Sequence, residues 1–124
     1  MRLRRDDAGF TLVELLVVLI IIAILLTLGV SSFRGLKTRA QSSTAKANIR
    51  MAIPAANAYY ADNKTYVGMT NALLRSTYDK GIPTTVTLSS LTATSYTLTY
   101  VRGSCTARVT GPGPTITVTG TGCT

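Results

Sequence analysis

The sequence predicts an α+β protein in which one long N-terminal helix packs against a small antiparallel sheet of three to four strands. Two observations predict it. The first half of the chain has an apolar run followed by an alanine-rich stretch with helical periodicity. From residue 84, apolar residues alternate with polar ones, which is the period of half-buried strands. We expect five segments: a leader over 1–9, an apolar helix over 10–30, an amphipathic helix over 31–62, a connecting loop over 63–83, and a sheet with its C-terminal loop over 84–124.

The apolar run is almost unbroken from Phe10 to Val30. As a helix it would rise roughly 31 Å, which matches a hydrocarbon core of about 30 Å. Glu14 interrupts it, and a carboxylate one turn inside such a helix costs on the order of a few kcal/mol unless it is paired. We therefore expect Glu14 to have a partner. The nearest candidate is the amine that a cut between Gly9 and Phe10 would create, after a leader that carries Arg2, Arg4 and Arg5.

The segment 9–14 (GFTLVE) and the apolar tail behind it resemble the class III signal of type IV pilins and the related pseudopilins. The resemblance covers residues 4–30 closely and continues loosely to residue 66. It implies the pilin fold and a membrane aspartic peptidase, the prepilin peptidase, that cuts after Gly9. It also implies that the new N-terminal residue, Phe10, is N-methylated and that Glu14 guides subunit docking in a filament. Pairing the Phe10 amine with Glu14 between neighbouring subunits would relieve two costly buried charges.

Three other interpretations compete for the apolar run. A secretory signal peptide has an apolar region of about 7 to 15 residues before a small-residue cleavage site, so this longer run before Ser31-Ser32 fits it poorly. A single-pass anchor explains the length but neither Glu14 nor Gly9-Phe10. A buried helix of a soluble domain fits least well. Basic residues lie on both sides of the run, so the positive-inside rule alone does not fix the topology.

The helical pattern continues after the apolar run. We expect the following residues to lie near one face: Leu36, Ala40, Ile49, Ala52, Ile53, Ala56 and Tyr60. The opposite, solvated face would carry Arg34, Lys37, Arg39, Lys46 and Arg50, with Gln41, Ser42, Ser43 and Asn48 between them. The pattern predicts one helix from about Thr11 to Ala61. Pro54 removes a backbone donor, so we expect a kink near residues 50–53, and Asp62-Asn63 favour a turn at the end.

The remaining chain reads as a loop and a meander. Residues 66–79 predict a connecting loop with a short helix over 71–76. The inward-facing strand residues are expected to be Val86 and Leu88; Tyr96, Leu98 and Tyr100; Cys105, Ala107 and Val109; Ile116 and Val118. Turns at Arg102-Gly103 and at 111–114 (GPGP) separate the strands, and threonines suit the exposed face.

The two cysteines, Cys105 and Cys123, are the only ones in the sequence. Without the leader and the apolar run, fewer than about 100 residues remain, and so small a domain often needs a staple. On the oxidising side of a membrane, which export implies, we expect a disulfide that contributes roughly 3 kcal/mol. The spacing fits neither a redox pair nor a zinc site, and the chain has no histidine.

Composition argues against catalysis. After Gly9 the acidic residues are Glu14, Asp62 and Asp79, so there is no acid/base pair, and we expect neither an enzyme nor a cofactor or metal site. The formal net charge is +8, which attracts polyanions such as DNA or anionic surfaces. The candidate DNA-binding residues are Arg75, Lys80, Arg102 and Arg108. A solvated or packing role is nevertheless favoured for them.

We hypothesise a structural subunit, a bacterial type IV pilin, held in the inner membrane as a single-pass precursor and assembled with copies of itself into a helical surface filament. The resemblance implies the peptidase, an assembly ATPase and an inner-membrane platform as partners, and adhesion or motility as roles. The alternatives are a pseudopilin of a type II secretion system and a DNA-uptake pilin with a basic head. The lack of acidic residues after Asp79, together with the cysteine pair, favours a pilus over a pseudopilin with an acidic calcium-binding loop.

Overall fold

The computed structural model of the chain describes residues 9–124, and most of the expected leader lies outside them. The chain divides into two compact units, one ending at Arg34 and one from Gly35 to Thr124. Seven elements follow in order: α1 (Leu12–Asn63), α2 (Asn71–Leu73), the π-helix η1 (Leu74–Tyr78), β1 (Thr87–Ser89), β2 (Tyr96–Arg102), β3 (Cys105–Gly111) and β4 (Ile116–Thr119).

Helix α1 spans 52 residues and confirms the predicted long helix. Its last turn is closed by Asn63, whose side-chain amide donates to the Tyr59 carbonyl at 3.0 Å. Lys64 then takes a left-handed conformation, with φ of 58°, while its N–H donates to the Tyr60 carbonyl at 2.8 Å. This is a common way for a helix to end. The helix continues without interruption through Pro54, so the kink there stays a prediction.

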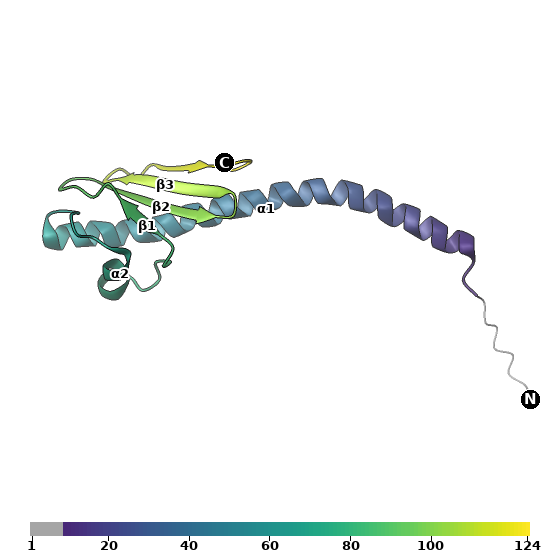
Figure 1. Cartoon of the computed structure of the whole chain (residues 1–124), viewed down its shortest axis with the longest axis horizontal. Helices are drawn as coiled ribbons and strands as arrows, with labels where there is room; N and C mark the ends of the chain where they lie inside the picture. The colour runs from purple at the N-terminus through teal and green to yellow at the C-terminus, as the bar shows by residue number, and fades with distance from the viewer. Residues whose placement is uncertain (1–8) are drawn as a thin grey trace, which may run out of the picture. The chain divides into compact units, whose positions relative to one another are not determined.

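The four strands form one antiparallel sheet in the order β1-β2-β3-β4, which confirms the predicted meander. The register places Leu88 opposite Leu98, Leu98 opposite Val109, and Val109 opposite Ile116, so one apolar row crosses all four strands. The β2–β3 hairpin has two loop residues, and the first, Gly103, has a φ of 60° that favours glycine. Figure 1 shows the sheet lying along one side of the second half of α1.

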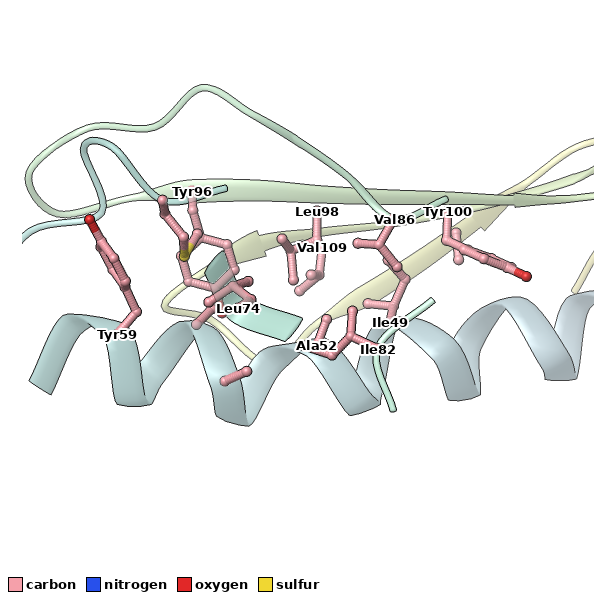
Figure 2. Packing of buried hydrophobic residues seen from close by; sticks show 14 of the residues in the cluster. Ile49, Ala52, Tyr59, Leu74, Ile82, Val86, Tyr96, Leu98, Tyr100 and Val109 are labelled. Carbon is pink, nitrogen blue, oxygen red and sulfur yellow. The ribbon is translucent and has the colours of Figure 1, made fainter. Parts of the chain in front are cut away.

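The core lies between the sheet and one stripe of α1, as Figure 2 shows. The stripe repeats at alternating steps of three and four residues, which keeps it on one helical face. Its members are Ser42, Ala45, Ile49, Ala52, Ala56 and Tyr59. Leu74 and Ile82 from the connecting segment complete the core beside sheet residues such as Leu98 and Val109.

The predicted face of α1 was wrong at its N-terminal end. Leu36 is 65% exposed and Ala40 is also exposed, whereas Ser42, expected in solvent, is buried. Nine residues advance a helix by half a turn beyond two full turns, so Ala40 lies opposite the buried Ile49. The Ser42 hydroxyl donates to the Thr124 carbonyl at 2.6 Å, which satisfies this buried polar group.

The segment between helix and sheet is more ordered than the predicted loop. Its short helix is confirmed and extends over α2 and η1, and the Thr70 hydroxyl caps it by accepting the Leu73 N–H at 3.2 Å. The Asn71 side chain donates to the carbonyls of Pro83, at 3.1 Å, and Val86, at 2.9 Å. Asn71 therefore ties this segment to the chain that enters β1.

Candidate functional site

The first unit exposes a long apolar surface. Helix α1 is long and apolar enough to cross a membrane, and its most apolar 18-residue window has a mean hydropathy of 3.0 with none of it buried. Phe10 is 71% exposed and Leu12 is 81% exposed, and large apolar side chains continue in this way to Val30. Burying one such side chain is worth about 1.5–3 kcal/mol. The segment therefore requires a cover of lipid or of other protein.

Glu14 lies in the first turn of this apolar helix. Thr11 precedes the helix, and its hydroxyl accepts the Glu14 N–H at 3.3 Å. Thr11 and Glu14 thus have the spacing of a capping box, in which a Thr or Ser and a Glu three residues later satisfy free N–H groups at a helix start. The sequence interpretation missed this cap, although the T-x-x-E spacing was visible. A carboxylate here also interacts favourably with the helix dipole.

The two residues at the expected cleavage point, Gly9 and Phe10, precede the helix and are exposed. A Cβ added to Gly9 would meet no atom within 4 Å. Packing within the described residues therefore places no demand for glycine at this position.

The disulfide between Cys105 and Cys123 is present, with an S–S distance of 2.03 Å and a Cα–Cα distance of 5.7 Å. Cys105 lies in β3 and is fully buried, while Cys123 belongs to the tail after β4. The bond therefore holds the tail against an inner strand, beside the Ser42–Thr124 hydrogen bond.

The four candidate DNA-binding cations lie on different parts of the second unit. Arg75 is in η1 and partly buried, and Lys80 is in the loop that follows. Arg108 is exposed between the buried Ala107 and Val109, so it points away from α1. Arg102 instead lines an open hollow beside α1. Arg102 and Arg108 therefore do not share one face of the sheet.

Within residues 9–124, no group of three or more His, Cys, Asp or Glu side chains could hold a metal ion. The polar contacts of the second unit tie segments together. The Tyr59 hydroxyl, for example, donates to the Val67 carbonyl at 3.1 Å, and the Tyr78 hydroxyl donates to an Asp62 carboxylate oxygen at 2.8 Å.

Comparison with known proteins agrees with this geometry. Residues 4–30 match the family model of the prokaryotic N-terminal methylation motif. The chain is also 32% identical, over 99 residues, to the type IV wide pilus major component PilA4 of Thermus thermophilus. That match covers 80% of this chain and 75% of the relative. No solved structure gives a significant match. With the signal motif, the exposed apolar helix and the four-stranded sheet, these similarities show that the chain belongs to the type IV pilin family.

Proposed function

We propose that this chain is a structural subunit of a type IV pilus on a bacterial surface. In this proposal it is made as a precursor anchored in the inner membrane, and the prepilin peptidase cuts it after Gly9. Phe10 is then N-methylated, and the mature chain assembles with copies of itself through the apolar part of α1. An assembly ATPase and an inner-membrane platform drive that step.

One observation carries the proposal: the apolar side chains of Phe10–Val30 are all exposed, and the segment has a single carboxylate, Glu14, in its first turn. Lipid can cover the apolar side chains before assembly, and the same segments of neighbouring copies can cover them afterwards. Glu14 is costly in lipid but can meet the Phe10 amine of a neighbour in a filament. The name of the Thermus relative, a major component of a wide pilus, supports the same role.

The filament role is favoured over the two alternatives. The tail that ends the chain is closed by a disulfide and contains no acidic residue, so it offers no calcium-binding loop of the kind expected in a major pseudopilin. The cations expected in a DNA-uptake pilin are dispersed over η1, a loop, a hairpin and the outer sheet face.

The intact mass of protein sheared from the cell surface tests the proposal. We expect a chain that begins at N-methylated Phe10. Gly9→Val should leave uncleaved precursor in the membrane, because a branched side chain obstructs the peptidase at a position where the fold itself has space. Gly29→Val is the matched control, since a Cβ at Gly29 also meets nothing within 4 Å. A mass that retains residues 1–9, or one that begins near Ser31, would contradict the proposal.

A further inference from the structure

Two open hollows lie against α1 within the second unit, each of about 420 Å³. The first, the basic hollow, is formed by Lys37, Ala40, Gln41, Thr44, Arg102 and Gly103. The second, the acidic hollow, is formed by Met51, Pro54, Ala55, Ala58, Tyr78 and Asp79. In each case four residues come from α1 and two from a segment that flanks it.

The two hollows occupy nearly the same face of the helix. Each of the four α1 residues of the acidic hollow follows its counterpart in the basic hollow by 14 positions, as Met51 follows Lys37. Fourteen residues of α-helix rise about 21 Å and turn to within about 40° of the starting direction. The two hollows therefore lie about 21 Å apart along nearly the same face of α1.

The rims of the hollows carry opposite charges. Lys37 and Arg102 are exposed cations of the basic hollow, and Asp79 is an exposed anion of the acidic hollow. Asp79 accepts the Gly81 N–H at 2.8 Å, but none of these three side chains has an ion-pair partner within residues 9–124. About 21 Å of helix separates the two rims, so the charges cannot pair within one molecule.

We infer that this face of α1 is an interface between copies of the chain, in which Asp79 of one copy pairs with Lys37 and Arg102 of its neighbour. The occupant is a second copy because the complementary charges stand on the same molecule, on nearly the same face of α1, and have no ion-pair partner within residues 9–124. Two copies whose helices lie side by side, with a stagger of about 21 Å and about half a turn around the helix axis between them, bring the acidic hollow of one opposite the basic hollow of the other. This inference rests on the proposed filament.

A carbodiimide applied to sheared filaments tests the pairing. The reagent activates the Asp79 carboxylate, and the Lys37 amine displaces a urea and forms an amide bond. This bond can form only between groups in contact. We expect peptide mapping to find the Asp79–Lys37 link in filaments and to find none in detergent-dispersed monomers. Filaments that form normally but lack this link, or that link Asp79 to other lysines, overturn the inference and leave the proposed function standing.

Substitution of Asp79 gives a second measurement. Asp79→Asn removes the charge but keeps an oxygen for the Gly81 N–H, so the local turn is retained. We expect a two- to about fivefold lower yield of filaments, the range of an exposed ion pair, and a smaller difference from wild type at high salt. Asp62→Asn is the matched control, because it removes the only other acidic side chain of the second unit and keeps an acceptor for Tyr78.

Equal filament yields from Asp79→Asn and Asp62→Asn contradict the pairing. A wild-type chain that forms no filament overturns the proposed function and this interface together.

Discussion

Glu14 is the single charged side chain in the apolar surface of residues 10–30. A carboxylate at this position has opposite effects in the lipid bilayer and in a filament. Before assembly a carboxylate in lipid is unfavourable, whereas in a filament it can meet the amine of a neighbouring Phe10. Its backbone N–H is satisfied by Thr11, so replacing the side chain keeps this capping bond and loses only the favourable interaction of the carboxylate with the helix dipole. We therefore expect the main energetic effect of Glu14 to lie in the proposed assembly.

We predict that Glu14→Ala gives normal or slightly raised amounts of membrane-inserted subunit and few or no filaments. The substitution removes an intramembrane carboxylate, which favours insertion, but it also deprives the new amine of its partner. Cell fractionation and electron microscopy of sheared material measure the two effects. Val13→Ala, in the same turn, should assemble normally. Abundant filaments from cells that express only Glu14→Ala would show that the pairing is dispensable.

Tyr96 carries an unsatisfied polar group, because its hydroxyl is buried without a hydrogen-bond partner among the described residues. The ring is fully buried, and it lies 4.6 Å from the Tyr66 ring, centroid to centroid. A Cβ on Gly111 would overlap the same ring, so glycine is required opposite it. Burial, and then the proximity of Tyr66, raises the pKa of Tyr96 to about 12.

We predict that Tyr96→Phe raises the free energy of unfolding by about 1 kcal/mol at neutral pH, since it removes an unsatisfied buried hydroxyl.

The raised pKa of Tyr96 also predicts the pH range in which the wild type loses stability. A group whose pKa is higher in the folded state stabilises the fold below its unfolded pKa of about 10 and loses that contribution as pH rises toward 12. The free energy of unfolding, measured with urea, should therefore fall more between pH 10 and pH 12 for the wild type than for the variant. Tyr100→Phe, in the same strand, is the control, and identical alkaline profiles for wild type and Tyr96→Phe would contradict the assignment.

At the residue scale the sequence predicted the disulfide and the inward-facing strand residues, because each follows from a local rule. Alternation fixes which side of a strand faces the helix, and two cysteines allow one pairing. Ser42 could not be placed in the same way. A serine between charged residues has the pattern of a solvated surface, and only the tail, 82 positions later, provides the carbonyl that makes its burial favourable.

The contact between α1 and the sheet depends on small side chains. Ala45, Ala52 and Ala56 are fully buried under the sheet, so the helix and the strands can approach closely. Figure 2 shows Ala52 beneath the apolar row of the sheet. Larger side chains in this stripe would push the two layers apart.

We predict that Ala52→Leu lowers the free energy of unfolding by about 1–3 kcal/mol through overpacking. Ala47→Leu makes the same chemical change at an exposed position of α1, so helix propensity is matched and little loss is expected. Chemical unfolding of the detergent-solubilised chain, followed by tyrosine fluorescence, compares them. Equal stability of the two variants would mean that the layers are not closely packed at Ala52.

The disulfide acts on the last element of the sheet. Cys123 follows β4, and its bond to β3 fixes the tail across a sequence separation of 18. We predict that Cys123→Ser lowers the free energy of unfolding by about 2–4 kcal/mol and reduces filament yield more than precursor cleavage. Ser104→Ala, at an exposed neighbouring position, should have little effect. Free thiols or intermolecular dimers in non-reducing peptide maps of the wild type would contradict the intramolecular staple.

The elements differ in how far the sequence could predict them. The long helix and all four strands have periodicities that persist over enough residues to be recognised, and α1 ends within two residues of its predicted end. The segment 71–78 is too short for periodicity to reveal its π-helical turn. Its order comes from distant contacts, such as the Asn71 side chain with Pro83 and Val86.

For the molecule as a whole, positive charge is a diffuse property. From Arg34 onward ten basic residues face two acidic ones, and the candidate cations are dispersed over several elements. We predict that any binding to DNA is weak, independent of sequence and strongly reduced by salt. Neutralising Arg108 alone or Lys80 alone should reduce it equally, and the quadruple variant at Arg75, Lys80, Arg102 and Arg108 should reduce it in proportion to charge. Gel-shift titrations at several salt concentrations measure this, and a dominant effect of one residue would indicate a true site.

The sheet is open, and its two edges are its shortest strands: β1 has three residues and β4 has four. Unpaired edges are templates on which identical chains add strands, and brevity is one of the ways in which proteins suppress such growth. A protein that polymerises at high local concentration can form its intermolecular contacts in two ways, through its helices or through the edge strands of its sheet. By keeping those edges short, this chain disfavours the amyloid-like route, which favours the proposed assembly through its helices.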